Sequence, residues 1–315
     1  MPDIDNCNLA VASKAPLWPG WEGINTIFSF GDSYTTTGFV AAQGPQPDAT
    51  HPLGTPQHQW QTSSNGPNWI CYLTTDCNEA PIKTYNLACG GATVASRLIH
   101  RFNPKVLSLE QQVEDVFLPL YPAGNRWQPS STLFALFLGI NDVGLLYTDH
   151  EPSVYDEYLA TYADLVLQLY NVGARSFLFL TVPSVDRSPL TTRQGPEASA
   201  KESVHIQYWN DGIARMADHL RQRPGTTVFV FDTRAPFSRV MDTQAAFPET
   251  AVYRDTTSFC PAYAGGTDQP DFSHPDWPLA ANEYLWLNDL HPTYPVHQLW
   301  ARLIAEQLKT GRSLM

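Results

Sequence analysis

The apolar run Thr132-Leu133-Phe134-Ala135-Leu136-Phe137-Leu138 decides the fold. Apolar residues without alternation are typical of a strand that is covered on both faces, as in a parallel sheet. Further β-prone runs occur along the chain, each followed by a helical pattern: Thr26–Phe30, Ile82–Ala88, Ser176–Val182 and Thr227–Asp232. This alternation predicts an α/β fold, a three-layer α/β/α sandwich with a five-stranded parallel sheet of flavodoxin-like type.

Apolar spacing also predicts the longer helices. Apolar residues recur at helical spacing between Pro152 and Gly173, and Ser203–Arg223 and Val296–Leu308 carry similar patterns. No Pro- or Ser-rich linker divides the chain, so we expect residues 1–315 to form a single domain.

The charge balance limits the class of partner. Acidic residues exceed basic ones by 31 − 19 = 12, which argues against nucleic acid and anionic membranes and is compatible with a neutral substrate. No run approaches the roughly 18 apolar residues that span a bilayer. Residues 1–20 lack the basic start and apolar block of a signal peptide, so the chain is either a mature form or an intracellular protein.

The cysteines give only a partial disulfide pattern. Cys71 and Cys77 are close enough in sequence for a small disulfide loop, and Cys7 with Cys260 is a possible second bridge. Cys89 lies in a run of small and apolar residues and is predicted to be a buried free thiol. The odd count weakens the disulfide argument, and no cysteine has metal-site spacing.

A serine follows the first predicted strand. In Phe28-Ser29-Phe30-Gly31-Asp32-Ser33-Tyr34 the apolar run stops at a glycine, and Ser33 follows two positions later. That places its hydroxyl at the carboxyl end of a parallel strand, where open α/β folds carry their chemistry. Serine is a weak nucleophile at neutral pH, and a Gly-Asp-Ser turn is common by chance, so a base and oxyanion donors are needed.

The remaining parts of such a site occur in order along the chain. His291 precedes Pro292, which suits a rigidly held general base. Asn141 follows the third strand, and Gly91 follows the second, so both are expected at the same edge as Ser33. The Asn141 side chain and the backbone amides of Gly91 and Ser33 would supply three donors to a tetrahedral oxyanion. Each segment alone is more often an ordinary turn or cap, and only their combination favours catalysis.

This combination resembles the Gly-Asp-Ser-Leu (SGNH) hydrolase superfamily, which is named for an essential Ser, Gly, Asn and His, here Ser33, Gly91, Asn141 and His291. The resemblance runs from about residue 24 to residue 308. The strings Phe30–Phe39 and Trp286–Tyr294 are similar to the fungal acetylesterases of carbohydrate esterase family sixteen.

The likeness implies a secreted serine esterase that removes acetyl groups from carbohydrate esters, such as acetylated xylo-oligosaccharides and related hemicellulose fragments. It implies an acyl-enzyme mechanism without metal or organic cofactor, and we expect a monomer without a separate carbohydrate-binding module. Two alternatives stay open. One is a lipid-directed short-chain esterase or lysophospholipase on the same fold, and the other is a non-catalytic carbohydrate-binding protein. The polar, Pro-rich loops argue against a lipase lid, and an intact Ser33 and His291 argue against lost catalysis.

The partner of His291 departs from the superfamily pattern. The acid usually stands three residues before the base, and that position is Asn288, whereas Asp289 stands two residues before it. Three interpretations remain: Asp289 turns inward as the acid, Asn288 or a backbone carbonyl orients His291, or a distant carboxylate serves. We favour Asp289, because an amide stabilises an imidazolium poorly.

Two long irregular stretches, 38–67 and 247–282, interrupt the strand–helix alternation. Loops of that length in a compact domain are usually functional or mobile. Several side chains in or near them could contact a substrate, although solvation or core packing is the simpler interpretation for each: His51, His58, Trp60, Trp69 and His274. His297 on the last helix is expected to be structural, Asp32 to bond its own turn, and Asp142 to cap the segment after it.

Overall fold

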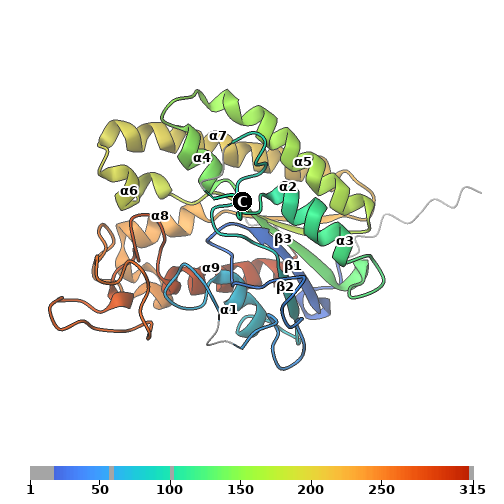
Figure 1. Cartoon of the computed structure of the whole chain (residues 1–315), viewed down its shortest axis with the longest axis horizontal. Coiled ribbons are helices and arrows are strands. Elements are labelled where there is room, and N and C mark those ends of the chain that lie inside the picture. The colour runs from blue at the N-terminus through green and yellow to red at the C-terminus, as the bar shows by residue number, and fades with distance from the viewer. Residues whose placement is uncertain (1–17, 57–59, 100–102, 312–315) are drawn as a thin grey trace, which may run out of the picture.

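A five-stranded, all-parallel sheet forms the centre of the molecule. The computed structural model describes residues 18–56, 60–99 and 103–311 (Figure 1). The strand order is β2-β1-β3-β4-β5. The strands are β1 (Thr26–Gly31), β2 (Lys83–Asn86), β3 (Thr132–Phe137), β4 (Ser176–Leu180) and β5 (Thr227–Phe231). The predicted fold class is therefore confirmed, and each predicted run matches its strand to within two residues at either end.

The strand order fixes where a ligand can bind. β1 pairs with β2 on one side and with β3 on the other. The connection that leaves β1 therefore leads to one side of the sheet, and the strands from β3 onward are added on the other side. In doubly wound folds the crevice for ligands lies at this switch point, outside the carboxyl ends of the two strands. Ser33 follows β1 and Asn141 follows β3, so both stand at that point.

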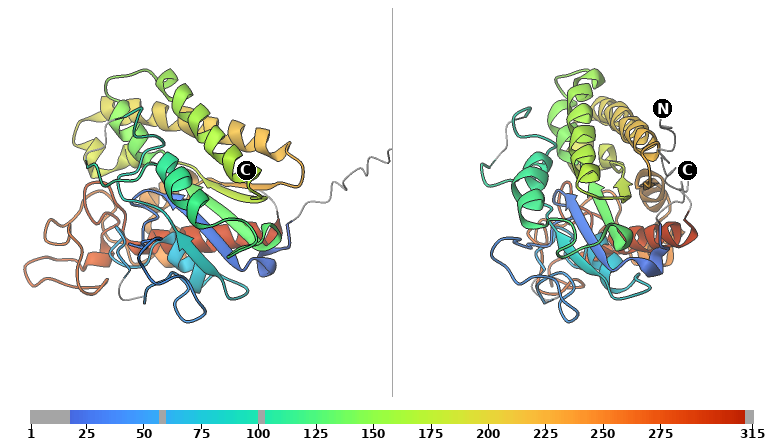
Figure 2. Two further views of the ribbon diagram at one scale, coloured as in Figure 1. Left: turned by 45° about the vertical axis from the view of Figure 1, so that its right-hand side comes forward. Right: turned by 90° about the vertical axis from the view of Figure 1, so that its right-hand side faces the viewer.

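Helices cover both faces of the sheet, as Figures 1 and 2 show. One layer is built around α5 and α7, and the other contains α1 and α9 packed together with α8 beside α9. The helices are α1 (Trp69–Thr75), α2 (Leu109–Gln111), α3 (Leu118–Leu120), α4 (Ile140–Leu146), α5 (Tyr155–Asn171), α6 (Pro189–Thr192), α7 (Pro196–Arg221), α8 (Arg234–Asp242) and α9 (Tyr294–Thr310). A π-helical segment, Gln112–Phe117, joins α2 to α3.

One helix begins earlier than its apolar pattern indicates. α7 starts at Pro196, whereas the sequence predicts a start at Ser203. Pro196 stands in the first turn, where its missing N–H costs no hydrogen bond. The first turns of α7 bury little, and its buried side chains begin at Glu202, so apolar periodicity could not reveal them.

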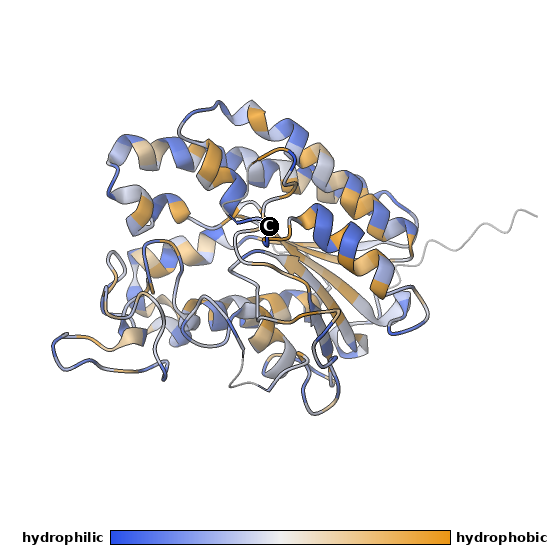
Figure 3. Ribbon diagram, viewed as in Figure 1, coloured by the Kyte–Doolittle hydropathy of each residue, from blue (hydrophilic) through white to orange (hydrophobic). Residues whose placement is uncertain are grey.

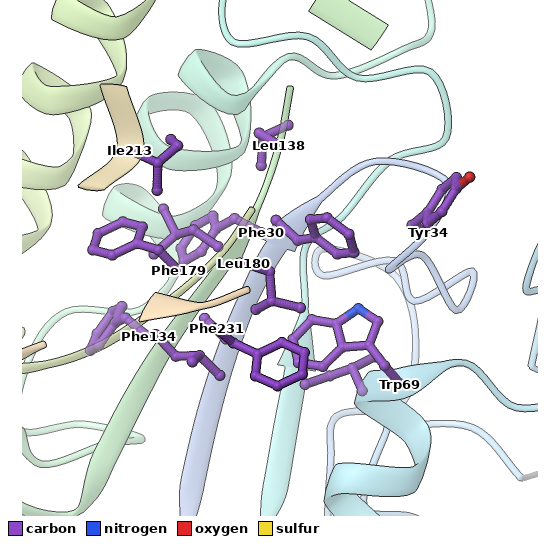
Figure 4. Close-up of a cluster of buried hydrophobic side chains, with 14 of the residues drawn as sticks. Phe30, Tyr34, Trp69, Phe134, Leu138, Phe179, Leu180, Ile213 and Phe231 are labelled. Atoms are coloured by element: carbon purple, nitrogen blue, oxygen red, sulfur yellow. The ribbon is translucent and has the colours of Figure 1, made fainter. Parts of the chain in front are cut away.

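The core is apolar and rich in aromatic rings. β1, β3 and β4 are buried at every position, and much of the sheet is coloured hydrophobic in Figure 3. Figure 4 shows one cluster of buried side chains, in which Phe30, Phe134 and Phe179 come from these strands. Each such side chain contributes about 1.5–3 kcal/mol by leaving water, so the sheet is a rigid platform for the loops at its carboxyl edge.

The predicted small disulfide is wrong, because Cys71 and Cys77 are both free. Cys71 is buried within α1, and Cys77 follows the end of that helix. Cys71 is held inside the helix while Cys77 lies beyond its C-cap, so the helix does not bring the two sulfurs together. Cys89 is free as predicted but only partly buried, and its Sγ lies 3.4 Å from the backbone N of Leu107. Cys260 is also free, and Cys7, its suggested partner, lies outside the described residues.

Within the described ranges, none of the helices is long and apolar enough to cross a membrane.

Candidate active site

Ser33 stands on a tight turn at the carboxyl end of β1. The Asp32 side chain accepts a hydrogen bond from the backbone N–H of Tyr34 at 2.9 Å, and the Asp32 carbonyl accepts from Thr35 at 3.1 Å. Gly31 has no room for a side chain, because a Cβ there would lie 2.8 Å from Thr35 Oγ1 and 3.0 Å from the Phe137 carbonyl. The glycine before the turn therefore lets the chain bend tightly enough to present the serine hydroxyl.

His291 lies within hydrogen-bond distance of that hydroxyl. Its Nε2 is 2.7 Å from Ser33 Oγ, although the two residues are 258 positions apart in sequence. The other ring nitrogen, Nδ1, is 3.0 Å from Asn288 Oδ1. The imidazole thus bridges the serine and an asparagine, in the arrangement that a nucleophile, a base and an orienting group require.

The hydrogen bonds of Asn288 assign the tautomer of His291. Asn288 Oδ1 accepts from the backbone N–H groups of Leu290 at 3.1 Å and His291 at 2.9 Å, while Nδ2 donates to the Ala264 carbonyl at 3.4 Å. The atom facing Nδ1 is therefore the amide oxygen, which can only accept. Nδ1 must carry the proton, and Nε2 presents its lone pair to the Ser33 hydroxyl.

The expectation that the Asp289 side chain turns inward to His291 is wrong. The Asp289 carboxylate forms an ion pair with Arg193 at 3.0 Å, and its carbonyl accepts from Leu190 at 2.8 Å. The position three residues before the base is the one that faces the ring, and it holds the amide of Asn288. No carboxylate among the described residues is hydrogen-bonded to the ring of His291.

Burial without a directly bonded carboxylate keeps His291 neutral. Desolvation lowers the pKa of His291 from 6.5 to about 4, and the nearby charge of Asp289 opposes this shift only in part. The imidazole is therefore uncharged, and able to accept a proton, at neutral pH.

Tyr34 links the nucleophile to the loop that carries the base. Its hydroxyl donates to the Leu290 carbonyl at 2.7 Å, and its ring centroid lies 5.5 Å from that of His291. Because Tyr34 directly follows Ser33, this hydrogen bond ties the two catalytic segments together at adjacent residues. Sequence reasoning missed this role, since nothing in the local pattern shows which buried tyrosine reaches a distant carbonyl.

The loop that carries Gly91 lies next to Ser33 and is hydrogen-bonded to Asn141. Asn141, in the first turn of α4, donates from Nδ2 to the Ala92 carbonyl at 2.8 Å, which leaves the second hydrogen of that amide available. A Cβ built on Gly90 would lie 3.9 Å from Ser33 Cβ, so this loop passes over the serine. Gly91 has φ +81°, a left-handed conformation that favours glycine. Within the described ranges, the backbone N–H groups of Ser33 and Gly91 donate to no backbone carbonyl.

Two buried carboxyls lie beneath these donors. Asp32 bonds its own turn as expected, whereas Asp142 accepts from the backbone N–H of Val94 at 3.0 Å instead of capping α4. Asp142 therefore fixes the loop that carries Gly91. Burial raises the pKa of each carboxyl to about 7, and the charge of Asp142 adds to the shift at Asp32. Their role is structural support directly behind the reacting groups.

The other sequence candidates are mostly structural. Trp69 is fully buried, and its Nε1 donates to Thr35 Oγ1 at 3.1 Å, so it supports the serine turn from the core. His297 is buried within α9, as expected. His51 and His274 lie in loops beside Asp48 and Asp276, and His58 lies outside the described residues. Within the described part of the chain, no group of three or more His, Cys, Asp or Glu side chains could hold a metal ion.

A cleft of about 760 Å³ opens beside the base. It is lined by His291, Asn288 and the two long irregular stretches, including Trp60 from the first. Its volume is in the range of small-molecule sites. The geometry thus brings Ser33, a neutral His291 and an adjoining cleft together at the carboxyl edge of the sheet.

Comparisons with known proteins give the family and its relatives. A sequence model of the family described as GDSL-like lipase/acylhydrolase matches residues 27–304. An acetylesterase from Thermothelomyces thermophilus is 29% identical over 290 residues, covering 90% of this chain and 88% of that protein. A thermolabile hemolysin from Vibrio parahaemolyticus is 27% identical over 241 residues, covering 75% of this chain and 51% of that protein. Among solved structures, an acetylxylan esterase from Geobacillus stearothermophilus aligns with a TM-score of 0.49 at 18% identity, covering 90% of this chain and 94% of that chain.

Proposed function

Because the chain belongs to the GDSL-like lipase/acylhydrolase family and is therefore a carboxylic ester hydrolase, we propose that it removes acetyl groups from carbohydrate esters through an acyl-enzyme on Ser33. The family predicted from the sequence, and its likeness to fungal acetylesterases, are confirmed by the matched residues 27–304 and by the 29% identical acetylesterase. The substrate, the mechanism and the residue roles below are the proposal.

The observation that carries the proposal is the 2.7 Å contact between Ser33 Oγ and His291 Nε2. As Oγ attacks the ester carbonyl, Nε2 takes the hydroxyl proton. The amides of Ser33 and Gly91 and the Asn141 side chain hold the oxyanion. The resulting imidazolium gives its proton to the departing alcohol, which leaves acetate esterified to Ser33. His291 then takes a proton from water, the hydroxide attacks the acyl group, and acetic acid leaves as Ser33 recovers its proton.

Asn288 acts in this scheme by orientation. Its amide oxygen holds Nδ1–H and so keeps the lone pair of Nε2 on the serine. It carries no charge, so it stabilises the imidazolium less than a carboxylate would. The catalytic unit is then Ser33 and His291 with a neutral positioning residue, and the predicted acid Asp289 stays outside it.

An acetate ester of a polar alcohol is favoured over a long-chain lipid ester by the acetylesterase relative and by the cleft. The relative from Thermothelomyces thermophilus is an acetylesterase. The cleft beside His291 is lined largely by amides, hydroxyls and glycines, not by the continuous apolar surface that a long acyl chain would need. We propose that the natural substrates are acetylated xylo-oligosaccharides and related hemicellulose fragments. We further propose that the protein acts on them as a secreted monomer and that the reaction needs no metal or cofactor.

The lipid-directed alternative is separated from this proposal by chain length. Rates on acetyl, butyryl and octanoyl esters of one aryl alcohol should fall steeply beyond acetyl, and a maximum at octanoyl would favour the lipid-directed enzyme. Ser33→Ala should abolish acetyl release from acetylated xylo-oligosaccharides, followed by NMR, while its circular dichroism spectrum matches wild type. Retained turnover by that variant would refute the role of Ser33.

A further inference from the structure

The walls of the cleft beside His291 come from two segments that are far apart in sequence. We define the first wall as residues 60–67 and the second wall as residues 264–270. His291 and Asn288 line the same cleft, so a molecule in the cleft lies against the base that protonates the leaving group. The departing alcohol of an ester must leave past His291 Nε2. The cleft is therefore placed to hold the alcohol half of the substrate.

The lining of the cleft selects an uncharged, hydroxyl-rich group. Both walls present hydroxyls and amides, among them Thr62, Ser63 and Gln269, and Trp60 adds an aromatic side chain. Asp268 is the acidic lining residue, and no lysine or arginine lines the cleft within the described part of the chain. Phosphate and carboxylate groups are recognised by such cations. A neutral sugar can hydrogen-bond to these walls, whereas an anionic group would be repelled by the negative charge of Asp268.

Asn65 joins the two walls. Its Nδ2 donates to Thr267 Oγ1 at 2.9 Å and to the Pro270 carbonyl at 3.3 Å, and its Oδ1 accepts from the Thr267 backbone N–H at 2.7 Å. Asn65 is only 9% exposed, so its side of these hydrogen bonds is largely removed from water, while Thr267 and Pro270 are half-buried. Its φ of +52° is the only positive value at a non-glycine residue within the described ranges. A left-handed backbone costs most residues free energy, and asparagine tolerates it best after glycine.

The second wall is also tied to the catalytic base. Ala264, at its beginning, accepts a hydrogen bond from Asn288 Nδ2 at 3.4 Å, and Asn288 Oδ1 holds His291. The wall is thus anchored by Asn288 at one end and by Asn65 near its middle. Neither anchor touches Ser33 or the oxyanion donors.

We propose that Asn65 is a positioning residue that fixes the width of this cleft, and that the cleft binds the alcohol half of the substrate as a neutral sugar. The inference rests on the proposed function and specifies where that function gains its selectivity. Loss of the Asn65 side chain should let the walls separate, which weakens sugar binding without disturbing the transfer of the acyl group.

Asn65→Gly is the most direct test, because glycine keeps the left-handed backbone and removes only the side chain. We expect KM for acetylated xylobiose to rise about tenfold, because the hydrogen bonds that join the two walls are lost. The kcat/KM for an aryl acetate, whose alcohol half makes few polar contacts, should stay within about threefold of wild type. Thr267→Val removes the hydrogen bond between Asn65 Nδ2 and Thr267 Oγ1 by changing the other partner. It should raise the same KM by a smaller factor. Asn125→Gly, in an exposed loop before β3, is the matched control and should change neither value.

A parallel fall on both substrates in Asn65→Gly and Thr267→Val, or no change on either substrate, would overturn the inference. The charge argument is tested on wild type, which should prefer acetylated xylobiose to an acetylated sugar phosphate. Equal or faster turnover of the phosphate would overturn it. Failure of the proposed function looks different, since wild type would then cleave the aryl acetate and leave acetylated xylobiose intact.

Discussion

Replacing the amide that faces His291 with a carboxylate should move the acid limb of the pH–activity profile to higher pH. Asn288→Asp places a negative charge about 3.0 Å from Nδ1, where Asn288 Oδ1 now lies. At that separation two unit charges attract by about 1.4 kcal/mol in bulk water and about 5.5 kcal/mol at an effective dielectric constant of about 20. These energies correspond to about 1 and 4 pKa units, and measured shifts beside a single opposite charge are about 1–3 units.

The sign follows from the charge of the imidazolium. A carboxylate stabilises it, so the pKa of His291 rises from about 4 to about 5–7 in Asn288→Asp. Activity needs the neutral imidazole, so the acid limb of kcat/KM on an aryl acetate should move up by about 1–3 pH units. Asn288→Ala is the control. Asn288→Ala adds no charge, so the acid limb of kcat/KM should stay at low pH. Without its hydrogen bond to Asn288 the imidazole ring is free to rotate, which should lower kcat about a hundredfold. An unchanged limb in Asn288→Asp would refute the assignment of Asn288 as the group on Nδ1.

The other predictions concern groups around the catalytic pair. Asp289→Asn should change kcat on an aryl acetate by less than about threefold, since the carboxylate pairs with Arg193, and a fall of about four orders of magnitude would restore Asp289 as the acid. Tyr34→Phe loses the 2.7 Å bond to Leu290 and should lower the free energy of unfolding by about 1 kcal/mol in urea titration, with kcat reduced as the base loop loosens. In Asp142→Asn the pH dependence of Tm should flatten. The pKa of Asp142 is about 7 when folded against 3.8 unshifted, so its contribution to stability is present below about pH 4 and lost as pH rises through 7. If Tm of Asp142→Asn depended on pH as steeply as Tm of wild type, the Asp142 carboxyl could not be buried and protonated. Gly31→Ala should destabilise the protein by about 1–3 kcal/mol, because its Cβ would lie 2.8 Å from Thr35 Oγ1, and a wild-type urea midpoint would contradict that crowding.

The sequence predicts the sheet and the proposed catalytic pair because both depend on local patterns. Continuous apolar runs mark buried parallel strands, and strand ends place Ser33 and Asn141 at one edge. His291 was recognisable from its proline neighbour and from the family resemblance.

The orientation of side chains in irregular loops could not be predicted in the same way. Periodicity tells which face of a helix or strand is buried, but no such rule states whether Asn288 or Asp289 faces the ring. The link between Asn65 and Thr267 spans 202 positions, and its only local signal is an asparagine before a glycine in a polar loop. The spacing of Cys71 and Cys77 suggested a bridge, but the helix that holds Cys71 does not bring the two sulfurs together.

The central claim, that His291 activates Ser33 as a nucleophile, is tested most directly by covalent labelling with a fluorophosphonate and peptide mapping. We expect one adduct, on the peptide that contains Ser33, absent in Ser33→Ala and formed far more slowly in His291→Ala. An adduct on another residue, or none in active wild-type enzyme, would contradict the mechanism.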